Sequence, residues 1–278
     1  MEVIKSVDQM ANKVSNVERP VGFVPTMGAI HEGHMDLVRK SRCDNKTVVV
    51  SIFVNRAQFG SDEDFMWYPR DLEKDLRLLE QVDADIVFIP SEESMYPQGF
   101  EAQINVGSIT DKLEGKYRKG HFNGVATVVL KLFNIVQPDR VYFGQKDGQQ
   151  LAVISKMIKD LDLCIGLVKA PTVRDKKGLA ISSRNVNLTM EQLNAARVIY
   201  QALSEAKTLY QSGITKGSLL KSAVKSILHS ELLISSVDYV SVADPVTLEE
   251  LDEVCNIAMV STAVHIGGIR LIDNVILG

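Results

Sequence analysis

The stretch Gly22-Phe-Val-Pro-Thr-Met-Gly-Ala-Ile-His-Glu-Gly-His34 decides the fold that this sequence predicts. An apolar run over residues 21–24 predicts a buried strand. The apolar residues Met35, Leu37 and Val38 recur with helical spacing and predict a helix after the second glycine. A loop between strand and helix directs backbone N–H groups and the positive helix end at one point, which suits a phosphate.

Two histidines, His31 and His34, lie at this helix start with a glycine between them. Residues three apart lie on one face of a helix or turn, so both imidazoles can face the same anion. Gly33 lets the backbone approach closely, and an imidazole can donate a hydrogen bond to a phosphate near neutral pH. Two alternatives stay open: the histidines are capping or surface residues, or they bind a metal, for which the sequence supplies no further ligand cluster.

Apolar strands alternate with amphipathic helices through the first part of the chain. Further strands are predicted over residues 48–54, 84–90 and 140–144, and helices over 72–82, 124–136 and 147–161. Such alternation indicates right-handed βαβ units around a parallel sheet. Ligands of these sheets bind at the carboxyl ends of the strands.

Polar side chains follow the predicted strands at these ends. Asn55 and Gln58 can hydrogen-bond a polar substrate there, although loop amides as often cap backbone groups. Lys146 supplies a point charge suited to a phosphate, although a lone lysine is more often a surface residue. Gln150 lies one helical turn beyond that lysine, in a helix whose expected N-cap is Asp147.

Thr26-Met-Gly-Ala-Ile-His-Glu-Gly-His34 resembles the HxGH signature of the nucleotidylyl-transferase superfamily, and within it the pantothenate synthetase (pantoate–β-alanine ligase) family. The resemblance covers essentially the whole chain and includes later blocks at residues 55–59, 91–99, 118–122, 144–147 and 182–185. It implies a Rossmann-like parallel-sheet domain that joins pantoate to β-alanine with ATP. The implied path runs through a pantoyl-adenylate and releases pyrophosphate and AMP.

The resemblance also implies which residues act. His34, His31, Lys146 and Arg184 are expected to stabilise charge on the phosphates as pyrophosphate leaves, with His34 also a possible proton donor. ATP is expected to bind at Met27, Gly28, Ala29, Ile30, His31, Glu32, Gly33, His34, Gly144, Gln145, Lys146, Asp147, Val173, Ile181, Ser182, Ser183 and Arg184. Pantoate and β-alanine are expected at Gln58, Gln150 and Asn55.

A metal ion and a second chain are further implications of the family. Mg²⁺ is expected because it bridges triphosphate oxygens, with Asp71 or Asp75 as residues that lie near it. A homodimer is expected from the resemblance alone.

Residues in two loop segments depart from the family's pattern. Arg56-Ala57 stand where the family has Pro-Thr, and the loss of proline's fixed φ predicts a less rigid loop. Lys119 replaces a proline in the polar segment 112–121. That segment is expected to be either a solvated loop or a mobile one that brings Arg118 or His121 toward an anion.

The composition changes after residue 188, and the remaining chain predicts a small α+β unit. Helices are expected over residues 189–213, with Thr189 as N-cap, and over 216–230. Strands are expected over residues 237–245, 258–266 and 269–272. We therefore expect a Rossmann-like domain that binds ATP and pantoate over residues 1–175, and a smaller lid domain over residues 176–278.

The composition argues against several other classes of protein. No apolar run approaches the roughly 20 residues of a membrane span. A net charge of −4 without a basic block argues against a nucleic-acid partner, although the superfamily includes tRNA-charging enzymes. Three scattered cysteines indicate neither a disulfide framework nor a zinc motif, and the N-terminus lacks a signal-peptide pattern, so a cytoplasmic protein is expected.

Two other functions compete with ligation. A transferase that adenylates a phosphate ester would need a basic pocket for the second phosphate, where the sequence has the amides Gln58 and Gln150. A non-catalytic nucleotide-binding regulator of the same fold would not need His34 and Lys146 together with the loop at residues 182–184.

Overall fold

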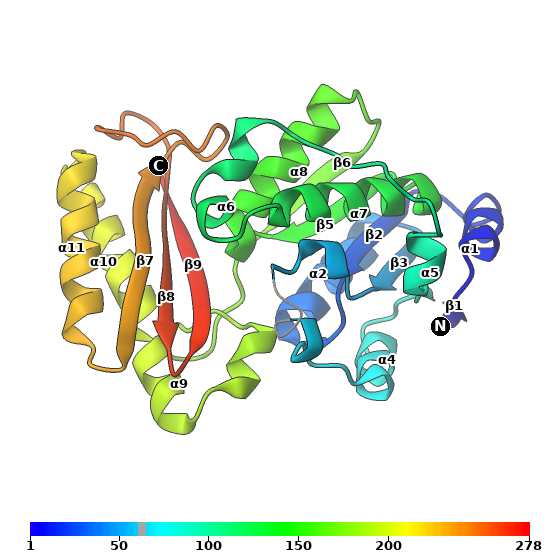
Figure 1. The fold of residues 1–278 in the computed structure, drawn as a ribbon, viewed down its shortest axis with the longest axis horizontal. Coiled ribbons are helices and arrows are strands. Elements are labelled where there is room, and N and C mark those ends of the chain that lie inside the picture. Colours follow the sequence, from blue (N-terminus) through cyan, green and yellow to red (C-terminus); the bar gives the residue numbers. More distant parts are fainter. Residues whose placement is uncertain (61–64) are drawn as a thin grey trace. The chain divides into compact units, whose positions relative to one another are not determined.

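The chain forms two compact units in a computed structural model that describes residues 1–60 and 65–278 (Figure 1). Unit 1 comprises residues 1–110, 118–144 and 153–170, and unit 2 comprises residues 111–117, 145–152 and 171–278. Helix α8 (Gly148–Asp160) therefore begins in unit 2 and ends in unit 1.

Unit 1 is built on a parallel sheet of six strands in the order β1-β4-β3-β2-β5-β6. The strands are β1 (Glu2–Ile4), β2 (Val21–Thr26), β3 (Thr47–Ile52), β4 (Ile86–Phe88), β5 (Arg140–Gly144) and β6 (Gly166–Ala170). The strand order changes direction between β2 and β5, and such switch points are where open α/β sheets bind ligands. The stretch that includes both histidines follows β2 directly.

Helices cover this sheet and complete the core of unit 1. They are α1 (Val7–Val14), α2 (Glu32–Asp44), α4 (Leu72–Glu80), α5 (Glu92–Met95), α7 (His121–Val136) and the later turns of α8. Met35 and Val38 of α2 share one buried cluster with Val24 of β2 and with Val48 and Val50 of β3. The predicted inner face of the helix after Gly33 is thus confirmed, and the strand it packs on is the one that precedes it.

Unit 2 contains an antiparallel sheet of three strands in the order β7-β8-β9. The strands are β7 (Ile234–Ala243), β8 (Ala258–Ile266) and β9 (Ile269–Leu277), and the helices are α6 (Glu114–Tyr117), α9 (Met190–Ala196), α10 (Val198–Gln211) and α11 (Gly217–Ser230). Gly267 and Gly268 connect β8 to β9 with positive φ at both positions, as a two-residue hairpin requires.

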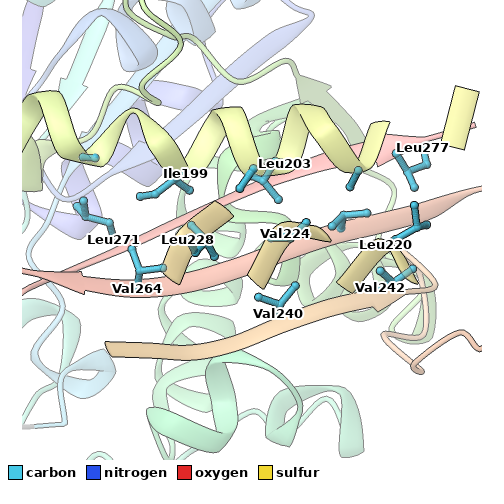
Figure 2. Close-up of a cluster of buried hydrophobic side chains, with 14 of the residues drawn as sticks. Ile199, Leu203, Leu220, Val224, Leu228, Val240, Val242, Val264, Leu271 and Leu277 are labelled. Carbon is cyan, nitrogen blue, oxygen red and sulfur yellow. The ribbon is translucent and has the colours of Figure 1, made fainter. Parts of the chain in front are cut away.

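The core of unit 2 lies between its two long helices and its sheet. Figure 2 shows side chains of both helices packed against the strands: Ile199 and Leu203 of α10, Leu220, Val224 and Leu228 of α11, and Val240, Val242, Val264, Leu271 and Leu277 of the sheet. All ten are buried. Burial of apolar surface at about 25 cal/mol per Å² makes such a cluster the main stabilising contribution within a unit of this size.

The expected fold class is confirmed: a Rossmann-like parallel sheet with helices is followed by a smaller α+β unit. The helical stretch predicted over residues 189–213 is confirmed, but a break at Arg197 divides it into α9 and α10. The Arg197 N–H bonds Asn194 O in a tightened turn, and its guanidinium pairs with Asp175 at 3.1 Å. Thr189 caps α9 as predicted, in a capping box with Gln192.

Cys43, Cys164 and Cys255 are free and exposed. No helix among the described residues is long and apolar enough to cross a membrane.

Candidate active site

The residues after β2 form a tight turn before α2 begins. Gly28 and Ala29 both have positive φ, +81° and +49°, in a region that glycine adopts freely and other residues rarely. Thr26 Oγ1 accepts a hydrogen bond from Gly28 N at 3.1 Å and donates one to Ser51 O at 2.7 Å. The turn is therefore tied to β3 as well as to its own strand.

A buried carboxylate, Asp75 of α4, holds the next two backbone groups of the turn. Ala29 N donates to Asp75 Oδ2 at 2.9 Å, and Ile30 N donates to Asp75 Oδ1 at 2.7 Å. Burial raises the pKa of this carboxyl, and the two backbone hydrogen bonds oppose the rise. A Cβ on Gly28 would lie 2.9 Å from Asp75 Oδ2, so the glycine also makes room for the carboxylate.

The two aspartates expected near Mg²⁺ have other partners in the structure. Asp71 is the N-cap of α4 and accepts a hydrogen bond from Lys74 N at 3.1 Å. Asp75 uses both oxygens on the backbone, as described above. Among residues 1–60 and 65–278, no group of three or more His, Cys, Asp or Glu could hold a metal ion. The residues do not fit a dedicated Mg²⁺ site, and the same finding goes against a metal at the two histidines.

The imidazoles of His31 and His34 stack on each other at the start of α2. Their ring centroids are 4.0 Å apart and their planes differ by 21°. His31 occupies the N-cap position, yet its side chain makes no cap hydrogen bond, which goes against the capping alternative. A Cβ on Gly33 would lie 3.0 Å from His31 Cε1, so the glycine leaves room for that ring. Two imidazoles and the first N–H groups of a helix thus lie together, an arrangement suited to an anion.

Two buried amides follow β3 and are fixed by a chain of hydrogen bonds. Asn55 Nδ2 donates to Gln58 Oε1 and to Gly124 O, both at 3.1 Å. Tyr96 OH donates to Asn55 Oδ1 at 2.7 Å. Gln58 Nε2 lies 2.9 Å from Met27 Sδ, which belongs to the turn after β2. Within unit 1 the structure therefore brings the expected substrate amides next to the expected nucleotide turn.

The loop that lacks the family's proline is held by α7. It forms the short 3₁₀ helix η1 (Arg56–Gln58), and Gln58 O lies 2.6 Å from His121 Nδ1. A Cβ on Gly124 would lie 2.3 Å from Ala57 O, so the helix packs directly on the loop backbone. The expected loss of rigidity is therefore offset by a hydrogen bond and by close packing.

The segment 112–121 is not the solvated loop that its composition predicts. Residues 114–117 form α6, and Glu114 is buried and bound to Arg270. His121 is also buried and begins α7, with Arg118 Nη1 3.0 Å from its Nε2. Because a carbonyl only accepts and a guanidinium only donates, these contacts assign His121 as the neutral ring with its proton on Nδ1.

In unit 2, residues expected at the nucleotide phosphates line one pocket. Lys146, Ser182 and Arg184 contribute to its wall, together with Arg270 of β9. Arg184 Nη1 donates to Arg270 O at 3.0 Å, and Lys146 Nζ lies 3.2 Å from Asp147 Oδ1. Cationic side chains and a hydroxyl are thus grouped beside the carboxylate of Asp273, and the cationic groups suit an anion.

A short hairpin leads into the serine-containing loop of this pocket. Ile181 N donates to Val173 O at 3.0 Å, and Arg174 and Ala180 form a bridge between the two arms. Ser182 caps the 3₁₀ helix η4 (Ser183–Asn187), with Arg184 N 3.3 Å from its Oγ.

A buried glutamine, Gln149, was missed by sequence reasoning. Its Nε2 donates to Lys112 O and its Oε1 accepts from Glu114 N, both at 2.8 Å. Gln150 beside it is partly exposed. Adjacent residues of a helix point in different directions, so these two glutamines have different surroundings.

The predicted site residues divide between the two units. Residues 27–34, 55, 58 and 144 belong to unit 1, and residues 145–147, 150, 173 and 181–184 belong to unit 2. The shared role predicted for Gln58 and Gln150 crosses that division and stays a prediction.

The chain is similar over its whole length to one family of known proteins. The family model for pantoate-beta-alanine ligase matches residues 1–276. The pantothenate synthetase of Sulfurihydrogenibium sp. is 47% identical over 278 residues, with 99% of each chain covered. The crystal structure of pantothenate synthetase from Thermus thermophilus has a TM-score of 0.94 and 42% identity, again with 99% of each chain covered. A pantoate-beta-alanine ligase from Francisella tularensis, complexed with beta-gamma ATP and beta-alanine, has a TM-score of 0.82 and 34% identity and covers 99% of this chain and 97% of its own.

Proposed function

The chain belongs to the pantoate–β-alanine ligase family, and from this premise we propose how its residues carry out the reaction. The enzyme condenses pantoate with β-alanine and converts ATP to AMP and pyrophosphate. A carboxylate oxygen of pantoate attacks the α-phosphorus and pyrophosphate leaves. The amine of β-alanine then attacks the carbonyl of the pantoyl-adenylate, and AMP leaves as the amide forms.

The observation that carries the assignment of roles is the turn between β2 and α2. It is fixed by two hydrogen bonds to Asp75, and it is followed at once by the stacked rings of His31 and His34. Donors that are already in place where charge develops stabilise a transition state without a cost of reorganisation. Both histidines therefore donate hydrogen bonds to phosphate oxygens, and His34 also supplies a proton as pyrophosphate leaves.

The pocket of unit 2 supports the second part of the proposal. Lys146 and Arg184 supply positive charge to the phosphates, and Ser182 and Ser183 supply hydroxyl donors. Mg²⁺ enters with the nucleotide, as MgATP, because the aspartates of α4 already serve the backbone.

The amides recognise the organic substrates. Gln58, supported by Asn55, and Gln150 bind the hydroxyl and carboxylate groups of pantoate, and the amine of β-alanine arrives beside Gln58. A neutral amide can distinguish these groups by hydrogen bonding without trapping an anion by charge.

The test is the order of the two steps. Labelled pyrophosphate should exchange into ATP when pantoate is supplied and β-alanine is left out. Complete turnover should then give AMP only when all three substrates are present. Exchange that requires β-alanine would refute the adenylate-first order, and exchange without pantoate would mean that ATP is split in another reaction.

We propose further that the enzyme is a homodimer in the cytoplasm. The dimer is supported by the family resemblance, and three exposed free thiols suit a reducing compartment. Sedimentation equilibrium should give twice the chain mass of 30.8 kDa, and a monomeric mass at micromolar concentration would contradict the dimer.

A further inference from the structure

Two adjacent residues of β9, Asp273 and Asn274, are polar and almost fully buried. Each is 4% exposed, and each pairs across the sheet with β8 through the backbone. A buried polar side chain is costly unless hydrogen bonds replace its lost contacts with water. The partners of these two side chains therefore indicate their purpose.

The side-chain amide of Asn274 binds the segment that contains Lys146. Its Nδ2 donates to Gln145 O at 2.8 Å and to Lys146 O at 2.9 Å, and its Oδ1 accepts from Gln145 Nε2 at 3.0 Å. A Cβ on Gly148 would lie 3.1 Å from Asn274 Nδ2 and closer still to Met259 Sδ. The start of α8 is thus both hydrogen-bonded to β9 and packed on it without room for a side chain.

Asp273 serves the hairpin that leads to the serine loop. It binds the guanidinium of Arg174 through both oxygens, with Nη2 2.9 Å from Oδ1. Arg174 Nη1 donates to Gly178 O at 3.1 Å, and its Cζ lies 3.9 Å from the centre of the Tyr200 ring. Arg174 also bridges to Ala180, two residues before the first serine.

We propose that Asp273 and Asn274 are positioning residues of the ligase reaction. Asn274 sets the backbone of Lys146, and Asp273 sets the loop of Ser182 and Arg184 through Arg174. Successive side chains of a strand leave opposite faces, so β9 binds residues 145 and 146 on one face and Arg174 on the other, and residues 270–273 of the strand help to line the pocket. This inference rests on the proposed function, in which that pocket binds the nucleotide phosphates.

Replacement of the amide NH₂ of Asn274 by an oxygen tests the role of this residue. Asn274→Asp keeps the shape but replaces the NH₂ donor by an oxygen that faces the carbonyls of Gln145 and Lys146. Displacement of a preorganised group by about 1 Å costs up to about 10²-fold in rate, so kcat of pantoate-dependent pyrophosphate exchange should fall about 10- to 100-fold. Val275→Ala is the matched control, because its side chain alternates to the other face of β9 and packs on the core of unit 2. It should lower Tm and leave the exchange rate within about twofold.

Double variants separate positioning from a general structural role. If Asn274 acts through Lys146, Asn274→Asp should lower the exchange rate of a Lys146→Ala variant by less than about twofold. In an Arg184→Ala variant it should lower the rate as much as it does in the wild type. Asp273→Asn should show the reverse pattern, with its loss absent in the Arg184→Ala background. Should Asn274→Asp fail to fold, Asn274→Ser, which keeps one donor, takes its place in the same comparison.

The outcomes distinguish this inference from the function on which it rests. A wild-type enzyme without exchange overturns the proposed function. Wild-type exchange with Asn274→Asp equal to Val275→Ala overturns the positioning role alone. Full loss from Asn274→Asp in both the Lys146→Ala and Arg184→Ala backgrounds overturns it as well, because the asparagine would not act through the lysine.

Discussion

The turn after β2 and the segment after β5 are both held by a buried polar side chain, but one anchor accepts hydrogen bonds and the other donates them. Each places candidate phosphate ligands beyond the carboxyl end of a strand, and each is held by one buried side chain from elsewhere in the sequence. In unit 1 the anchor is the carboxylate of Asp75, which accepts from two N–H groups. In unit 2 it is the amide of Asn274, which donates to two carbonyls.

The difference shows that the exposed backbone groups determine the anchor. Residues 29 and 30 present N–H groups and need an acceptor, whereas residues 145 and 146 present carbonyl oxygens and need a donor. Only the carboxylate can titrate, so the two anchors should respond differently to pH.

Removal of one candidate phosphate ligand from each unit should give the largest and similar losses. Lys146→Ala and His34→Ala are each expected to lower kcat about 10²–10³-fold, because a preorganised charge stabiliser is lost. Tm should be unchanged in both. Lys40→Ala, which removes a lysine on the surface of α2 that is 39% exposed, is the control. Near-normal turnover in Lys146→Ala would remove that lysine from the site, and a lower Tm alone in His34→Ala would restore the capping interpretation.

Loss of the carboxylate anchor should come next. Asp75→Asn leaves one acceptor and turns an NH₂ group toward a backbone N–H, a cost of about 1–3 kcal/mol. We expect kcat/KM for ATP to fall about tenfold or more, with little change in Tm because a buried charge is also relieved. Asp71→Asn makes the same chemical change at the N-cap of the same helix and should leave ATP kinetics unchanged. Equal kinetics of the two variants would contradict the anchor.

Acid should loosen the same anchor in the wild-type enzyme. The pKa of Asp75 is raised above 3.8 by burial, so the folded state holds this proton more tightly than the unfolded state does. The stability contributed by this group is therefore full below pH 3.8 and is lost as pH rises through the raised pKa. Protonation of Asp75 removes one acceptor from the turn, so activity should fall as the pH is lowered through the raised pKa. This is the same range in which the stability contributed by Asp75 increases. Measurement of kcat/KM for ATP from about pH 4 to 7 should show this decrease at acid pH in the wild type and not in Asp75→Asn.

A smaller effect is expected for the amide assigned to pantoate. Gln150→Ala should weaken pantoate binding about tenfold, the cost of roughly one hydrogen bond, and leave ATP binding nearly unchanged. Calorimetric titration of each ligand separately measures both. Gln149→Ala is the neighbouring comparison and should lower Tm, because its amide bonds residues 112 and 114. Equal losses for pantoate and ATP would mean that Gln150 is misassigned.

The smallest effect should follow loss of the contact that supports Gln58 from α7. His121→Ala removes a donor to Gln58 O and should raise KM for pantoate a few-fold with kcat nearly kept, a cost of about 1 kcal/mol. His229→Ala removes an exposed histidine of α11 and serves as the control. An unchanged KM would show that Gly124 packing alone fixes the loop.

Local signals explain what could be predicted from the sequence. Apolar runs and helical spacing identified β2, β3 and α2, and the Thr189 cap was visible within four residues. The edge strand β6 (Gly166–Ala170) was not predicted; it is only five residues long, and most of it is partly exposed. The N-terminal β1 and α1 were also not predicted.

The anchors could not be read from the sequence, because their partners are distant in it. Asp75 lies 45 residues from Ile30, and Asn274 lies 128 residues from Lys146. The aspartate was therefore interpreted as a residue near Mg²⁺. The turn of His31 and His34 was recognisable because strand, glycines and helix start are contiguous.

The three native thiols offer a direct way to watch the enzyme at work. Cys43 and Cys164 belong to unit 1 and Cys255 to unit 2, and all are exposed. A Cys164→Ser variant keeps one reactive sulfur on each unit for a donor and an acceptor dye. Resonance energy transfer between the dyes, recorded as ATP, pantoate and β-alanine are added in turn, would measure the distance between the labels on Cys43 and Cys255 at each addition. Native cysteines thus provide sites for attaching the two dyes without introducing new residues.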